Sequence, residues 1–144
     1  EMLAVVQNLL PVDVAVFAAA VADWRVDVAQ EKKMKKQLSG ALPVVNFVEN
    51  PDILSTVSQH SLRPKLVVGF AAETENLVVN AKKKRLRKGC DWIVANDVTP
   101  ATCIMGGPNN TVTVIDENGV EAWADMPKTD VARRLAQRIV GTLI

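Results

Sequence analysis

Three short runs of mostly apolar residues have the length and composition of strands that are buried on both faces. They cover residues 12–20, 66–70 and 91–97. A strand that helices cover on both faces has no solvent side, so its hydrophobic residues need not alternate with polar ones. The three runs therefore predict the parallel strands of a sheet.

The segment between the second and third runs, residues 74–89, is predicted to be a helix. Gly89 is placed as its C-terminal stop. The apolar residues that recur at roughly helical spacing in it are Leu77, Val78, Ala81 and Leu86. A strand, a helix and a second strand form the crossover unit of a parallel sheet.

Three further helices are indicated. Residues 1–10 resemble the tail of one helix, and a second begins with Asn50 as N-cap and Pro51 as its first residue. Thr129 can cap a closing amphipathic helix. The apolar residues of that closing helix lie four apart: Val131, Leu135, Ile139 and Leu143.

After residue 97 the pattern changes to alternation and predicts an antiparallel hairpin that turns at Asn118 and Gly119. The hairpin residues Val112, Val114 and Trp123 can either fill the core or form a subunit interface. No repeat or linker divides the chain. We expect residues 1–144 to form one α/β domain on a mainly parallel sheet. Because the chain starts without methionine inside a helix, we expect it to be an N-terminally truncated fragment.

Composition narrows the function classes. Hydrophobic residues make up 49% and charged residues 23%, as in ordinary globular proteins, and the net charge of +1 is less lopsided than a nucleic-acid binder requires. No apolar run is long enough to cross a membrane. Cys90 and Cys103 are too few for a disulfide scaffold, which favours reduced thiols and a cytoplasmic location. The single histidine, His60, leaves little room for a Ser-His-Asp triad or a zinc site.

Each predicted strand is followed by small residues and by an acidic or amide side chain. These side chains are Asp23, Glu73, Asn96 and Asp97. Ligands of parallel sheets bind outside the carboxyl ends of the strands, so the three exits favour a pocket. The alternative is that the small residues only ease the packing of helices on strands.

Two basic segments are candidates for binding an anion. Neither a G-x-G-x-x-G nor a G-x-x-x-x-G-K-[ST] motif is present, so another element must hold any phosphates. The first segment contains Lys32, Lys33, Lys35 and Lys36, and it is either a solvated run or a flap that closes on a polyphosphate. The second covers residues 82–88, where the helix C-terminus alone favours cations. Lys84 and Lys88 share one helix face.

Five blocks in order, "AAAVADW", "KMKK", "NPDIL", "VGFAAETENL" and "KGCDWIVANDV", closely resemble the bacterial phosphopantothenoylcysteine synthetases. These are the ligase half of a bifunctional coenzyme A biosynthesis protein. The resemblance implies a Rossmann-like sheet and a reaction that joins L-cysteine to 4′-phosphopantothenate. CTP would drive it through an acyl-cytidylate, with Mg²⁺ neutralising the triphosphate.

The resemblance also assigns residues. Lys33 matches the first lysine of the family's K-x-K-K flap and is the predicted catalytic residue. The predicted nucleotide-binding set is Phe17, Ala18, Ala19, Asp23, Lys33, Pro51, Asp52, Ile53, Leu54, Phe70, Lys84 and Lys88. The metal ligands are not assigned.

Partners follow from the same resemblance. It implies a cytoplasmic homodimer, fused in the full-length protein to a flavin-dependent decarboxylase domain, with no nucleic acid or membrane partner. The family's N-terminal segment, with its Gly-rich phosphate loop, is not among these residues. Two alternatives stay open. The same ligation can be driven by ATP, or the domain can be a non-catalytic α/β module whose basic flap docks an acidic partner.

Overall fold

The computed structural model describes residues 1–28, 44–99 and 106–144. The helices are α1 (Met2–Asn8), α2 (Ile53–Ser58), α3 (Leu77–Lys88) and α4 (Lys128–Leu143). The strands are β1 (Val14–Phe17), β2 (Trp24–Val26), β3 (Phe47–Glu49), β4 (Leu66–Glu73), β5 (Trp92–Asp97), β6 (Asn109–Asn110), β7 (Val112–Ile115), β8 (Val120–Ala122) and β9 (Met126–Pro127). No helix of the described part is long and apolar enough to span a membrane.

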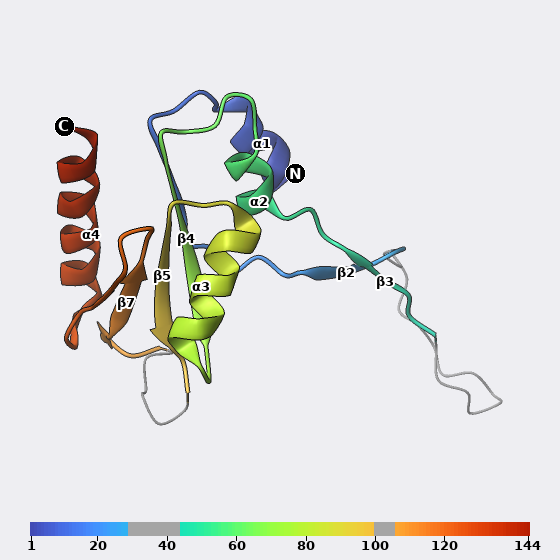
Figure 1. The fold of residues 1–144 in the computed structure, drawn as a ribbon. Coiled ribbons are helices and arrows are strands. Elements are labelled where there is room, and N and C mark those ends of the chain that lie inside the picture. Colours follow the sequence, from blue (N-terminus) through green and yellow to red (C-terminus); the bar gives the residue numbers. More distant parts are fainter. Residues whose placement is uncertain (29–43, 100–105) are drawn as a thin grey trace.

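A five-stranded sheet in the order β1-β4-β5-β7-β8 forms the centre of the molecule (Figure 1). β1, β4 and β5 are parallel, with Phe17 opposite Gly69 and Val68 opposite Trp92. β7 joins β5 in the antiparallel sense and returns as β8. The predicted α/β class, the three parallel strands, the crossover helix and the C-terminal hairpin are therefore confirmed.

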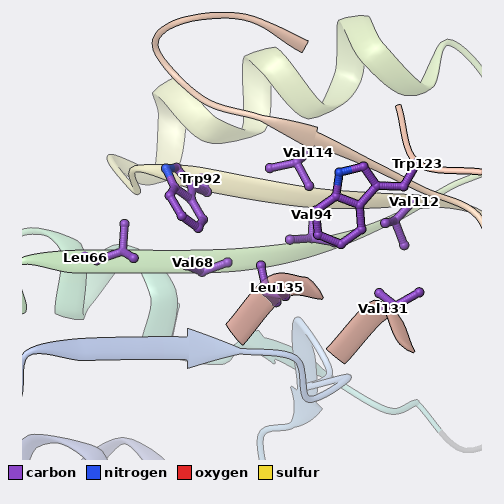
Figure 2. Close-up of a cluster of buried hydrophobic side chains, with 9 residues drawn as sticks. All are labelled: Leu66, Val68, Trp92, Val94, Val112, Val114, Trp123, Val131 and Leu135. Atoms are coloured by element: carbon purple, nitrogen blue, oxygen red, sulfur yellow. The ribbon is translucent and has the colours of Figure 1, made fainter. Parts of the chain in front are cut away.

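The sheet is covered on both faces because successive side chains of each central strand point to opposite sides and nearly all are apolar. One face packs against α4, and Figure 2 shows the buried side chains of this layer: Leu66, Val68, Trp92, Val94, Val112, Val114, Trp123, Val131 and Leu135. The hairpin residues Val112, Val114 and Trp123 thus fill the core, and the interface interpretation of them is wrong.

The opposite face carries smaller side chains, and helices α2 and α3 cover it. Its buried residues are Val67, Ala71, Ala81, Cys90, Ile93, Ala95 and Ile115. Burial raises the pKa of the Cys90 thiol to about 11, so this cysteine is a packing residue and a poor nucleophile at neutral pH. Leu86 shares the helical spacing of Leu77, Val78 and Ala81, but 73% of it is exposed.

Gly69 lets α2 approach this face of the sheet closely. A Cβ atom at position 69 would lie 2.6 Å from Leu54 Cδ2 and 3.0 Å from Ile93 Cδ1. Real Cβ atoms are essentially never found as close as the first of these distances, so Leu54 occupies the space that a side chain at 69 would take.

Arg63 ties together the ends of the sheet and helices opposite the carboxyl ends of β4 and β5. Its Nη2 donates to both carboxylate oxygens of Asp91 at 2.9 Å, and its Nε donates to the Ser58 carbonyl at 2.9 Å. Asp91 Oδ2 also accepts the Val67 N–H at 2.7 Å. One guanidinium nitrogen of Arg63 thus serves both carboxylate oxygens of Asp91, and this charge-assisted contact links the starts of β4 and β5.

Two helices begin differently from the prediction. Asp52, rather than Asn50, is the N-cap of α2, because its carboxylate accepts the Ser55 N–H at 3.0 Å. The N-cap of α4 is Pro127 and makes no side-chain hydrogen bond, so Thr129 does not cap this helix. The first difference arises because Asn50 and Asp52 can both act as caps, and in the second the helix begins without any side-chain cap. The predicted stop of α3 at Gly89 is confirmed by its left-handed φ of 70°.

A two-stranded antiparallel arm, formed by β2 and β3, extends away from the sheet (Figure 1). It was not predicted from the pattern of the chain. Its apolar side chains are exposed: Trp24 at 59% and Phe47 at 64%. A two-stranded ribbon alone is marginally stable in water, and exposed apolar side chains of this kind commonly mark a contact surface.

Candidate functional site

A cavity of about 740 Å³ lies along the edge strand β1, bounded by the segment that follows β1, by the start of α2 and by one face of α3. Every described residue of the predicted nucleotide-binding set lines it: Phe17, Ala18, Ala19, Asp23, Pro51, Asp52, Ile53, Leu54, Phe70, Lys84 and Lys88. Lys33, the predicted catalytic residue, lies outside the described residues. The structure therefore brings the described part of the set together, while its binding role stays a prediction.

The register of the sheet explains how residues far apart in sequence meet here. β1 ends at Phe17, which pairs with Gly69, so Phe70 lies directly beyond that pair. α3 runs back along the sheet from the end of β4 and packs beside α2, where Lys88 forms an ion pair with Asp52. For this reason Lys84 and Lys88 reach the cavity although they lie late in their helix.

The cavity has a cationic wall and an apolar wall. Arg87 joins Lys84 and Lys88 on the cationic side, and sequence reasoning did not select it. The apolar wall comes from α1, β1 and the segment between them: Met2, Val6, Leu9, Leu10, Val12, Val14 and Val16. Such a cavity can accept a ligand that has one anionic end and one less polar end.

Asp52 connects the two sides of the site. Its carboxylate caps α2 and also forms an ion pair with Lys88, whose side chain is only 15% exposed. Burial by itself would raise the pKa of the Asp52 carboxyl. Hydrogen bonds from Lys88 and from the Ser55 N–H, with the positive charges of Lys88 and Arg87, hold that pKa below its ordinary value of 3.8.

The lowered pKa of Asp52 predicts a pH-dependent contribution to folding. A carboxyl whose pKa is lower in the folded state stabilises the protein above its unfolded pKa, and this stabilisation is lost as the pH falls through the folded pKa. The variant Asp52→Asn keeps a capping oxygen but loses the charge. Because the pair is partly exposed, we expect the variant to unfold with about 0.5–1 kcal/mol less free energy at pH 7.

Urea denaturation at several pH values measures this difference, which should shrink once the pH falls below about 4. Asp13→Asn is the matched control, because Asp13 pairs with Lys65 while 71% of its side chain is exposed. It should leave the unfolding free energy nearly unchanged at every pH. A wild-type advantage over Asp52→Asn that stays constant down to strongly acidic pH would contradict the charge pair.

The other predicted exit residues do not line this cavity. β4 continues four residues past the level where β1 ends, to the pairing of Glu73 with Asp97. Four residues of strand span about 13 Å, so Glu73 and Asp97 lie well beyond the end of β1. Glu73 accepts a hydrogen bond from Asn80 Nδ2 at 3.3 Å, and Asp97 accepts one from the Thr99 N–H at 2.9 Å. The segment after β1 therefore lines this cavity together with Phe70, whereas Glu73, Asn96 and Asp97 do not line it.

Within the described residues, no group of three or more His, Cys, Asp and Glu side chains is placed to hold a metal ion. The carboxylates that line the cavity are Asp23, Glu49 and Asp52, and the last is already paired with Lys88. This donor set fits Mg²⁺ that arrives on nucleotide phosphates, since Mg²⁺ commonly keeps several waters and takes only one or two protein carboxylates.

Comparison with known proteins gives consistent matches. Residues 1–143 match the family model described as the DNA/pantothenate metabolism flavoprotein C-terminal domain. The coenzyme A biosynthesis bifunctional protein CoaBC of Haemophilus influenzae is 37% identical over 122 residues, which cover 85% of this chain and 30% of that protein. The Escherichia coli K12 protein of the same name is 40% identical over 102 residues, 70% of this chain and 25% of that protein.

Solved structures agree. The crystal structure of the C-terminal domain of a CoaBC bifunctional protein matches with a TM-score of 0.74 and 33% identity, over 99% of this chain and 61% of that one. The chain thus spans less than a third of the length of these two curated relatives.

Proposed function

The chain belongs to the DNA/pantothenate metabolism flavoprotein C-terminal domain family, and from this membership we propose that it is the nucleotide-binding part of a CTP-dependent phosphopantothenate–cysteine ligase. Its relatives are named coenzyme A biosynthesis proteins. The proposal rests on one observation: every described residue of the predicted nucleotide-binding set lines the same cavity, which has a cationic wall and an apolar wall.

The proposed reaction has two steps. In the first, a carboxylate oxygen of 4′-phosphopantothenate attacks the α-phosphorus of CTP, a P–O bond to the β-phosphate breaks, and pyrophosphate leaves. In the second, the cysteine amine attacks the activated carbonyl carbon, loses a proton, and expels CMP. A free carboxylate is a poor acyl donor, and the cytidylate supplies the leaving group that it lacks.

The described residues would bind and orient the nucleotide. Lys84, Arg87 and Lys88 present cations to the phosphates, where fixed positive charge stabilises negative charge in the transition state. Phe70 and the backbone at Phe17 to Ala19 border the space for the base and sugar. Mg²⁺, when bound with the nucleotide, would neutralise further phosphate charge, and Asp23 and Glu49 are the cavity carboxylates that would hold it, since Asp52 is paired with Lys88.

Nucleotide affinity tests this function. Isothermal titration of the complete natural protein with CTP or ATP, in the presence of Mg²⁺, should show preferential binding of CTP. The Lys84→Ala variant should bind CTP about tenfold more weakly, as expected for loss of one charge-assisted contact. Lys82→Ala is the matched control, because Lys82 is an exposed cation on the same helix that does not line the cavity. Clear preference for ATP would contradict the cytidine assignment.

We further propose that the protein is a homodimer whose contact includes the arm of β2 and β3. Exposed apolar side chains on both arm strands support this partner surface, since contiguous exposed apolar area of this kind commonly marks an interface. Burying the arm against a second copy would also supply the stability that an isolated ribbon lacks.

The variant Phe47→Asp is expected to shift the protein toward monomer, because a carboxylate would be desolvated in the contact. Sedimentation velocity at micromolar concentration measures this shift. Leu86→Asp is the matched control, since Leu86 is 73% exposed against 64% for Phe47 but lies on α3. A wild-type protein that sediments as a monomer, or an unshifted Phe47→Asp dimer, would contradict the arm contact.

A further inference from the structure

Two chain segments that carry predicted nucleotide contacts lie side by side where the arm joins the rest of the molecule. The chain enters β2 directly after Asp23 and leaves β3 directly before Asn50 and Pro51. The first pair of the arm is Trp24 opposite Glu49. The contacts between the two segments at this point therefore set the distance between Asp23 on one segment and residues 51–54 on the other.

Asn50 joins the two segments at that point. Its backbone N–H donates to the Asp23 carbonyl at 2.8 Å. Its side-chain Nδ2 donates to the Ala22 carbonyl at 2.8 Å. An asparagine amide has one accepting and one donating end, so the donating end must be turned toward Ala22 for this bond to form.

Arg25 fixes the orientation of that amide from outside the cavity. Its Nη1 donates to Asn50 Oδ1 at 3.1 Å and to the Glu49 carbonyl at 3.0 Å. Because a guanidinium can only donate, it selects the oxygen end of the amide and leaves Nδ2 for Ala22. Arg25 is not among the residues that line the cavity.

We propose that Arg25 and Asn50 are positioning residues for the nucleotide, which hold Asp23 at a fixed distance from the turn of residues 51–54. This role rests on the proposed function of the cavity. Arg25 acts through Asn50 and touches no ligand, so its effect on binding is an effect of geometry. We call the hydrogen bonds from Arg25 to Asn50 and from Asn50 to Ala22 and Asp23 the clasp. Loss of the clasp lets the two segments separate, and a displacement of about 1 Å in a binding group is enough to cost substantial affinity.

The test is the affinity of the complete natural protein for CTP, measured by isothermal titration together with the thermal unfolding midpoint. Arg25→Ala and Asn50→Ala should each raise the Kd about tenfold. The double variant should be no weaker than Asn50→Ala alone, because both changes break one clasp and are not additive. Lys65→Ala is the charge-matched control, since Lys65 is an exposed cation that pairs with Asp13 and does not line the cavity, and its Kd should equal that of the wild type.

Arg25→Lys separates geometry from charge. It keeps the positive charge but lacks the planar, fixed donor geometry with which Nη1 serves both acceptors, and we expect a Kd several-fold above the wild-type value. Additive losses in the double variant, or wild-type affinity in Arg25→Ala and Asn50→Ala, would overturn the positioning role while leaving the proposed function intact. A lowered unfolding midpoint with unchanged Kd would show a purely structural role and would also overturn it. Failure of the wild type to bind any nucleotide would remove the proposed function, and the positioning role with it.

Discussion

The complete protein with Lys33→Ala is expected to ligate cysteine to 4′-phosphopantothenate about 100- to 1,000-fold more slowly than the wild type, the usual loss when one charge-stabilising donor is removed. Lys33 matches the first lysine of the family's flap motif and lies outside the described residues. Its ammonium is proposed to close on the triphosphate and to stabilise the charge that develops at the α-phosphorus. Pyrophosphate release, followed with a coupled assay, measures the rate.

Lys83→Ala is the control for this prediction, because Lys83 is an exposed cation on α3 that does not line the cavity. Its turnover should equal that of the wild type, and circular dichroism should show that both variants keep the fold. Unchanged turnover in Lys33→Ala would contradict the catalytic role. It would favour the alternative of a non-catalytic module whose basic flap docks an acidic partner.

The second large effect concerns stability, and we expect Leu135→Ala to lower the free energy of unfolding by about 2–5 kcal/mol. Leu135 is 6% exposed and packs from α4 onto the sheet in the cluster of Figure 2. The truncation removes buried apolar surface and leaves a cavity that the rigid sheet cannot fill. Urea denaturation measures the loss.

Leu86→Ala makes the same chemical change at a helical position that is 73% exposed. Its unfolding free energy should stay within about 0.5 kcal/mol of the wild type, as for most surface substitutions. Equal losses in the two variants would mean that α4 does not contribute its apolar face to the core.

Long apolar runs made the central sheet predictable. The strands around Val68 and Val94 are buried on both faces, and this leaves a clear trace in the sequence. The arm left no such trace in the sequence, because β2 and β3 have three residues each and are separated in the chain by residues 27–46. The start of α2 was misplaced by two residues because Asn50 and Asp52 are both good caps. Only the hydrogen bonds show that Asp52 caps the helix while Asn50 joins the segments at the arm.

The candidate site was predictable from the resemblance but not from the topology alone. The rule for parallel sheets placed Asp23 and Glu73 together, yet unequal strand lengths separate them. The same rule gave no reason to expect Lys88 in the cavity, because sequence does not show that the end of the crossover helix packs beside the start of α2. Arg25 was missed since its partners, Glu49 and Asn50, come close only through the arm.

Because Gly69 has no side chain, the position that Leu54 takes in the cavity wall depends on a residue inside the sheet. Leu54 sits in the space left there and at the same time forms part of the cavity wall. One added methyl group on β4 would have to push this leucine aside, so the room available to a ligand is limited from behind the wall. A substitution at Gly69, which does not line the cavity, can therefore change which ligands fit into it.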